Sequence, residues 1–240
     1  MRKIVYLSMV SFVLFFSLNS AVYKAAANRG IPMLNVTSMA LIVVSILLGP
    51  ILLGGDRIRR IQEARTSSLF AMFLVAVMGG SLAFWFLAEG VSRAGVARGG
   101  VFLAMIPVST AVIDHIFGGT IARSDVIYGG MIVCGGVLLS TSGLDDSFRF
   151  GDVFLALAVL SFSTSNVCAR FAMRDVTPLS VTACRAIGGS IGLLALGGTP
   201  FASGWWGLIS GMFSVVFLVC FYIVIRYQGP TRAAFANIVS

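Results

Sequence analysis

Charged and metal-binding side chains are scarce in this sequence. Only 11% of its 240 residues are charged, whereas charged residues make up about a quarter of a typical soluble domain. There is a single histidine, His115, and the four cysteines do not have the spacing of a metal site. No G-x-x-x-x-G-K-[ST] run occurs, which excludes a nucleotide-binding P-loop. These absences exclude a soluble globular domain and an ATP-hydrolysing part, and we expect no metal and no cofactor.

Long apolar runs fill the sequence instead. Apolar residues account for 58% of the chain, and the mean hydropathy is +0.98. A helix needs about 20 mostly apolar residues to cross the hydrocarbon core of a bilayer. We therefore predict an all-α integral membrane protein, a multi-helix bundle with eight complete membrane helices and the start of a ninth near Ala233. The eight helices are expected at 4–23, 31–54, 69–88, 99–118, 126–142, 153–169, 176–197 and 204–225.

The net charge of +8 does not indicate nucleic-acid binding, because the basic side chains are spread one to four per loop. Cytoplasmic loops of membrane proteins are enriched in Lys and Arg. Eleven basic residues fall on the side of the N-terminus and five on the other side. We therefore expect a plasma (inner) membrane protein with a cytoplasmic N-terminus. The eleven are Arg2, Lys3, Arg57, Arg59, Arg60, Arg65, Arg123, Arg170, Arg174, Arg226 and Arg232, and the five are Lys24, Arg29, Arg93, Arg98 and Arg149.

The chain contains an internal repeat, which appears when the sequence is compared with itself at shifts of 146 and 134 positions. Since the first unit, 1–142, has five predicted helices, the second unit, 150–240, starts on the opposite side of the membrane. The two units are therefore expected to be inverted repeats. Pro107 would match a position 241, so we expect an incomplete second unit with three helices and the start of a fourth. The matched pairs are Phe16 with Phe162, Ser17 with Ser163, Lys24 with Arg170, Ala26 with Ala172, Pro32 with Pro178, Gly95 with Gly229 and Arg98 with Arg232.

Two stretches resemble a known family. The first unit has Pro107 in mid-helix and closes on GGMIVCGGVLL, and the second opens on GDVFLALAVLSFSTSNVCARFAMRDVTPLSVTACRA. Both are similar to the EamA-type repeat of the drug/metabolite transporter superfamily, over nearly the whole chain. The resemblance implies two five-helix units and a secondary transporter of small organic metabolites that works by alternating access, with efflux of amino-acid-like or related solutes. The sequence departs from the family at Thr120, where a glutamate is usual.

Two other functions stay open. A non-transporting membrane scaffold or an inactive truncated remnant would fit an incomplete second unit. A membrane enzyme acting on lipid is less favoured, because its paired catalytic groups would have to be Asp114 and His115, which point about 100° apart on a helix. The expected partners are a small-molecule substrate and the lipid bilayer, with a homo-oligomer left open.

The first predicted helix resembles a secretory signal peptide, since Arg2 and Lys3 precede an apolar run and small residues follow at 25–27. The run of about 20 residues is longer than a typical signal core. It also has an internal match in mid-chain, where a signal peptide cannot lie. We therefore expect a retained membrane helix.

Arg185 is the most informative candidate binding residue. It lies seven residues after Pro178, about 10 Å along a helix. An arginine near the middle of a membrane helix costs about 2.5 to 3.5 kcal/mol, so it is expected to face the bundle and find a partner. One interpretation is that Arg185 binds an anionic or carboxylate-bearing substrate. The other is structural, with an ion pair to Asp114 or a side chain that extends to the cytoplasmic interface.

Polar side chains occur at matched depths in the first helix of each unit. They are Asn19 with Ser20 in the first unit, and Asn166 with Ser163 and Ser165 in the second. Such groups either line a wet cavity or join helices through hydrogen bonds. Both interpretations stay open for them.

Two aromatic pairs complete the candidate site. Trp85 and Phe86, with Phe221 and Tyr222, are candidates for an aromatic wall around an organic solute, or for packing and interfacial anchors. Together with the polar groups, they lead to one set of predicted substrate-binding residues. That set is Asn19, Ser20, Trp85, Pro107, Asn166 and Arg185.

Three further features concern helix shape and coupling. Pro107 predicts a kink that frees a backbone carbonyl. The neighbouring Asp114 and His115 are candidates for ion or proton coupling, since His titrates near neutral pH. Small residues four apart predict close helix contacts, at the pairs Gly95/Gly99, Gly188/Gly192 and Gly207/Gly211.

Overall fold

The computed structural model describes residues 2–52, 54–120, 127, 129–131 and 150–236. Within these ranges the chain forms helices and no β-strand. Seven spans among the described residues are long and apolar enough to cross a membrane. The predicted all-α membrane bundle is therefore confirmed. The predicted helix 126–142 lies almost entirely outside the described residues.

The third and fourth predicted spans are each built from more than one helical element. Short helices also lie between the second and third spans and directly before α11. The elements of the first unit are α1 (Arg2–Ala27), α2 (Met33–Leu52), α3 (Gly55–Gln62), α4 (Thr66–Leu74), the π-helix η1 (Val75–Leu82), α5 (Ala83–Ala94), α6 (Val96–Ala104) and α7 (Ile106–Ile116). Those of the second unit are α9 (Phe150–Ala172), α10 (Pro178–Ala195), the 3-10 helix η2 (Pro200–Ser203), α11 (Gly204–Gln228) and α12 (Pro230–Ala236).

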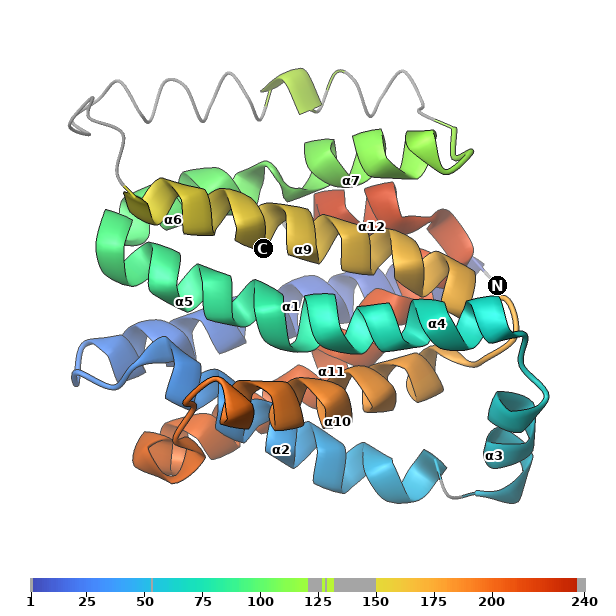
Figure 1. Cartoon of the computed structure of the whole chain (residues 1–240), viewed down its shortest axis with the longest axis horizontal. Coiled ribbons are helices and arrows are strands. Elements are labelled where there is room, and N and C mark those ends of the chain that lie inside the picture. The colour runs from blue at the N-terminus through green and yellow to red at the C-terminus, as the bar shows by residue number, and fades with distance from the viewer. Residues whose placement is uncertain (1, 53, 121–126, 128, 132–149, 237–240) are drawn as a thin grey trace.

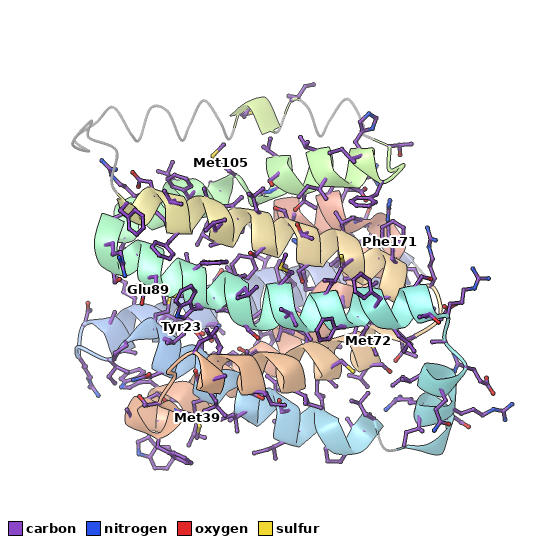
Figure 2. All side chains as sticks on the ribbon, viewed as in Figure 1. Tyr23, Met39, Met72, Glu89, Met105 and Phe171 are labelled. Atoms are coloured by element: carbon purple, nitrogen blue, oxygen red, sulfur yellow. The ribbon has the colours of Figure 1, made fainter. Side chains whose placement is uncertain are left out.

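The long helices lie side by side and alternate in direction (Figure 1). α1 begins at the end of the bundle where α3 lies, which we call the α3 end, whereas α9 begins at the opposite end. The first helices of the two units are therefore antiparallel. Figure 2 shows side chains with nitrogen-bearing tips around α3 and at the other helix ends. Of the larger predicted basic set, Arg57, Arg59 and Arg60 lie in α3, and Arg65 directly precedes α4. Arg170 and Arg226 lie in the last turns of α9 and α11.

Helix packing follows the inversion of the two units. α1 packs along α11, and α9 packs along α4, η1 and α5, which form the third span. α2 packs on α11, and α10 packs on η1 in the same third span. α2 and α10 pack on each other. Exchanging the two units turns the first two kinds of contact into their counterparts and leaves the α2–α10 contact unchanged, as inverted repeats require.

Phenylalanine rings hold α1 in the bundle. The Phe12 ring lies 5.2 Å from the Phe221 ring and 6.3 Å from the Phe217 ring, centroid to centroid. Phe16 meets Phe217 edge-on at 5.4 Å. Such aromatic pairs add about 0.5 to 1.5 kcal/mol beyond the area they bury. Aromatic side chains therefore pack α1 into the bundle.

Glycines allow close helix contacts at two of the three predicted pairs. A Cβ atom on Gly188 would lie 2.6 Å from Ala76 Cβ, and one on Gly211 would lie 2.5 Å from Val43 Cβ. The prediction is wrong for Gly95, because a Cβ atom there would meet no other atom within 4 Å and its φ is 95°. Gly95 instead forms the turn between α5 and α6, because positive φ suits glycine best. Its repeat partner Gly229 has the same conformation between α11 and α12.

Pro107 interrupts the fourth predicted span, which we expected to be one kinked helix. The helix stops at Ala104 and resumes at Ile106, with Pro107 in the first turn of α7. This is where proline is best tolerated, because the first amides of a helix have no intrahelical partner. The buried Ser163 hydroxyl of α9 donates to the Ile106 carbonyl at 3.2 Å. A side chain from the second unit thereby stabilises the break.

Each end of the bundle has a contact between a loop and the start of a long helix. At the α3 end, Asp175 in the α9–α10 loop accepts hydrogen bonds from Ser68 Oγ at 2.6 Å and from the Arg65 amide at 3.2 Å. We call this the Asp175 latch. At the opposite end, the Arg29 guanidinium in the α1–α2 loop lies 4.9 Å from the Trp206 ring centroid. Arg29 and Asp175 are repeat-related positions, at the shift of 146.

Candidate functional site

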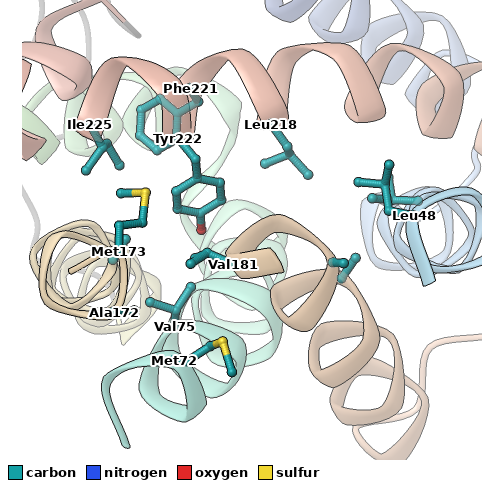
Figure 3. Close-up of a cluster of buried hydrophobic side chains, with 14 of the residues drawn as sticks. Leu48, Met72, Val75, Ala172, Met173, Val181, Leu218, Phe221, Tyr222 and Ile225 are labelled. Carbon is teal, nitrogen blue, oxygen red and sulfur yellow. The ribbon is translucent and has the colours of Figure 1, made fainter. Parts of the chain in front are cut away.

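The largest apolar cluster of the bundle joins helices of both units, and it surrounds a polar centre. Figure 3 shows Tyr222 extending from α11 into this cluster, toward Val75 and Val181. Tyr222 is fully buried although it carries a hydroxyl. A buried tyrosine hydroxyl generally needs a polar partner. Arg185 of α10 supplies it.

Arg185 is 4% exposed and is hydrogen-bonded within the bundle. Its Nη1 donates to Tyr222 Oη at 3.0 Å, and its Nη2 donates to the Gly79 carbonyl at 2.8 Å. Its guanidinium carbon lies 5.9 Å from the ring centroids of both Phe84 and Tyr222. Both structural expectations for Arg185 are therefore wrong. It does not pair with Asp114, and it does not extend to an interface, since the Gly79 carbonyl of the third span and the Tyr222 hydroxyl of α11 hold it inside.

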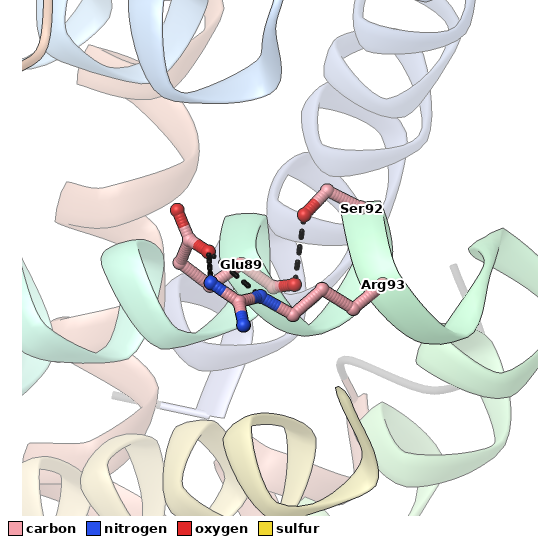
Figure 4. Close-up of polar contacts among 3 residues, drawn as sticks. All are labelled: Glu89, Ser92 and Arg93. Carbon is pink, nitrogen blue, oxygen red and sulfur yellow. Dashed lines mark hydrogen bonds and ion pairs between the residues drawn. The ribbon is translucent and has the colours of Figure 1, made fainter. Parts of the chain in front are cut away.

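The acidic side chains of the described residues lie elsewhere, so neutral acceptors alone hold the Arg185 guanidinium. Glu63 pairs with Arg59, and Glu89 pairs with Arg93 on the surface, where Ser92 also bonds the Glu89 carbonyl (Figure 4). Asp152 pairs with Arg98 at 2.7 Å and joins α9 to α6. Asp175 belongs to the latch, and Asp56 lies in the first turn of α3.

The π-helix η1 brings the Gly79 carbonyl to Arg185. π-helical turns inside α-helices occur often at functional sites, and this one contains the Gly79-Gly80 pair. A Cβ on Gly79 would collide with the Ser165 hydroxyl and lie 3.4 Å from Arg185 Cζ. A Cβ on Gly80 would lie 2.6 Å from the Arg185 carbonyl oxygen. Only glycine therefore lets the third span lie this close to α9 and α10.

Two polar atoms of this centre have no well-formed hydrogen bond within the described part of the chain. They are Ser165 Oγ and Arg185 Nε, and both are shielded from solvent. Leaving a buried polar group unpaired costs about 1 to 3 kcal/mol, and more when it is charged. We name the group formed by Gly79, Phe84, Ser165, Arg185 and Tyr222 the Arg185 centre.

Asp114 takes part in a different site, at the α3 end. Its carboxylate lies 2.8 Å from Arg170 Nη1 of α9. A pocket of about 290 Å³ opens beside this ion pair. Its walls include Thr120, the position at which the sequence departs from the EamA pattern. His115 is exposed, with Nδ1 3.2 Å from the Gly119 carbonyl oxygen. The walls are Asp114, Thr120, Arg170, Gln228, Gly229, Pro230, Thr231 and Arg232.

The predicted polar residues of the first helices have different surroundings. Asn19 is buried, and its Oδ1 accepts a hydrogen bond from Ser210 Oγ of α11 at 2.7 Å. Ser20 is exposed and bonds the Phe16 carbonyl of its own helix. Asn166 is 5% exposed, in α9 next to Ser165. Asn19 therefore joins α1 to α11, whereas Asn166 lies in the helix that supplies Ser165 to the Arg185 centre.

The predicted aromatic wall divides into two groups. Trp85 packs against Phe86 at 5.2 Å and against Phe154 at 5.9 Å, on the α5–α9 contact. Phe221 packs on Phe12 and on Tyr222 instead. The rings that flank Arg185 are those of Tyr222 and Phe84. Sequence reasoning missed Phe84 and Gly79, although the Gly79-Gly80 pair inside an apolar span was a signal of close backbone approach.

These features define a multi-pass helical membrane protein with a closed polar centre between two inverted units. The sequence model of the EamA-like transporter family matches residues 3–141 and 149–240. The chain therefore belongs to the EamA-like transporter family, within the drug/metabolite transporter superfamily. This is a family of membrane transporters, not enzymes. Among curated proteins, no sequence matches the chain significantly.

Proposed function

We propose that this protein is a secondary transporter that exports small, amino-acid-like or related organic metabolites across the plasma (inner) membrane by alternating access. Family membership supports membrane transport of the drug/metabolite type. The observation that carries the proposal is the Arg185 centre, where helices of both units meet around buried polar groups. In inverted-repeat transporters the substrate site lies near the membrane midplane between the repeats. Without a P-loop, the driving force comes from an ion or solute gradient.

The Asp175 latch and the Arg29–Trp206 contact, at opposite ends of the bundle, support alternating access. Inverted units can exchange conformations, which opens one end of the bundle while the other closes. Opening the α3 end separates the α9–α10 loop from α4 and breaks the Asp175 latch. Opening the opposite end separates Arg29 from Trp206. Both contacts are closed in this structure, and Arg185 is buried between them.

We assign three of the remaining predicted residues to the proposed transport path. Asn166 and Pro107 lie on α9 and α7, which pack on each other, and Trp85 lies on the α5–α9 contact. Asn19 is placed on the α1–α11 contact, while Ser20 faces outward and is left out of the proposed site. The Asp114–Arg170 ion pair beside the pocket is the candidate for coupling, because a proton or cation that neutralises Asp114 would release Arg170.

A reversible lock at the α3 end tests the transport proposal. The purified protein, with its native cysteines replaced by serine, carries Ser68→Cys and Asp175→Cys and is reconstituted into liposomes loaded with a metabolite mixture. We expect mass spectrometry to detect export by the reduced protein, loss of export after a short thiol cross-linker joins the two cysteines, and recovery when the linker is cleaved. The single variant Ser68→Cys is the matched control and keeps export under both conditions.

The proposal fails if solute release from liposomes with the reduced protein equals that from protein-free liposomes across the whole mixture. Release that the cross-link does not change would contradict alternating access through the α3 end, since the latch could then stay closed during transport.

A further inference from the structure

We propose that the Arg185 centre recognises a carboxylate group on the transported solute, so that the substrates are small organic anions or zwitterions. This inference rests on the proposed function and names the substrate class. It starts from the charge of the centre. The guanidinium group of arginine keeps its positive charge in proteins, so a full positive charge lies buried at Arg185.

The centre lacks a matching negative charge among the described residues, whose acidic side chains lie in other contacts or in α3. A buried cation is strongly destabilising unless it is paired. The Tyr222 hydroxyl and the Gly79 carbonyl offset part of this cost, but they are neutral. A carboxylate adds the attraction of an opposite charge, and it can accept two parallel hydrogen bonds from one guanidinium, which adds further energy. A carboxylate therefore gains more at Arg185 than any neutral acceptor does.

The arrangement of donors also fits a carboxylate. Arg185 Nε has no hydrogen bond within the described residues, and Ser165 Oγ has no well-formed one. An ε-nitrogen and an adjacent terminal nitrogen of arginine bind the two oxygens of one carboxylate side by side. The hydroxyl of Ser165 is a further donor close to the same guanidinium, since Gly79 lies next to both.

The surroundings of the guanidinium indicate what else the solute carries. Phe84 and Tyr222 flank Arg185, and the surrounding cluster is made of aliphatic, aromatic and sulfur-containing side chains. An apolar or aromatic body fits such a cluster. Because carboxylates that would hold an ammonium group are absent from the described part of the centre, the amine of an amino acid is not required. A simple carboxylic acid should bind as well as the corresponding amino acid.

Matched acids and amides test this assignment, because an amide has the same shape as the acid without its charge. The full chain in lipid nanodiscs is melted with four pairs of probes: acetate and acetamide, lactate and lactamide, 3-phenylpropionate and 3-phenylpropionamide, and phenylalanine and phenylalaninamide. A ligand that binds only the folded state raises the melting temperature with its concentration. We expect at least one acid to give the same rise at about a tenfold lower concentration than its amide.

Three variants assign the preference to the centre. Arg185→Gln should remove the acid preference, and Ser165→Ala should weaken acid binding by about tenfold. Arg185→Lys keeps the charge without the planar fork and should give an intermediate preference. Arg93→Gln, the same change at the surface pair of Figure 4, should leave the preference unchanged. Melting of each variant without probe shows that it is folded.

Equal responses to acid and amide in the native protein would overturn the inference, and so would an acid preference that persists in Arg185→Gln. Liposome transport of the same probes separates the two proposals. Acid-specific binding without transport would support the proposed carboxylate site and contradict the proposed transport function. Transport without a preference for acids would support the proposed transport function and contradict the carboxylate site.

Discussion

The Arg185 centre depends on two glycines whose missing side chains allow the helices to pack closely. Gly79 and Gly80 lie in η1, where a side chain would collide with Ser165 or with the backbone of α10. In a membrane, helices associate through close packing and interhelical hydrogen bonds, because lipid tails are as apolar as the side chains. The missing Cβ atoms therefore allow the third span to reach α10, and the Gly79 carbonyl to reach the guanidinium.

Gly79→Ala should destabilise the protein and Gly100→Ala should not. The first change inserts a methyl group against Ser165 Oγ and Cβ, which costs about 1 to 3 kcal/mol as overpacking. Gly100 lies in α6 with no atom within 4 Å of its added Cβ, and alanine is favoured over glycine in helices by about 1 kcal/mol. Thermal unfolding in one detergent, followed by tryptophan fluorescence, measures both. Equal melting temperatures would contradict the close packing at η1.

At the scale of elements, the Asp175 latch joins the α9–α10 loop to the first turn of α4. Its carboxylate accepts from backbone and side-chain donors at a helix N-terminus, where negative charge is stabilised by the helix dipole. The Ser68 hydroxyl, followed by the Arg65 amide, holds the pKa of Asp175 below its ordinary value of 3.8. The folded protein therefore favours the charged form more than the unfolded chain does.

This shift predicts how stability depends on pH. Because the pKa of Asp175 is lowered in the folded state, its contribution to stability is present above pH 3.8 and is lost as the pH falls through the folded-state pKa. Asp175→Asn should therefore lower the melting temperature at neutral pH, and the two curves should converge in acid. Asp56→Asn, a surface change in α3, is the control. A constant difference between Asp175→Asn and the native protein at all pH values would contradict the latch.

The whole molecule has an uneven distribution of charge over two otherwise similar units. Arg185 corresponds to Met39 at the shift of 146, and η1 is a π-helix while α11 is a continuous α-helix over the comparable span. The inverted packing therefore encloses an asymmetric centre. The basic loops at the α3 end also predict an orientation, with this end on the cytoplasmic side, because positive charge is enriched there in membrane proteins.

Labelling of single cysteines checks this orientation. In a background without native cysteines, Arg60→Cys in α3 and Arg29→Cys in the opposite loop are both exposed to solvent. A membrane-impermeant maleimide applied to intact cells should label Arg29→Cys at once, and Arg60→Cys only after the membrane is permeabilised. The reverse pattern would place the N-terminus outside.

The amino-acid sequence determined the membrane class, the positions of the described spans, the inverted repeat and the family, because these depend on local hydropathy and on residues spaced along the chain. It also indicated Arg185, because a charge within an apolar helix stands out without any structure. The partners of Arg185 depended on tertiary structure. Tyr222 and Gly79 are separated from it by 37 and 106 positions, and their approach depends on how α10, α11 and η1 cross.

The same reason explains the errors. One interpretation paired Asp114 with Arg185, but the α7–α9 contact places Asp114 beside Arg170. Phe84 and Trp85 are adjacent in sequence, yet the direction of the helix turns Phe84 toward the centre and Trp85 toward Phe154. Composition and periodicity show which helices cross the membrane. Which side chains meet at their crossings is decided only by the packing of the whole bundle.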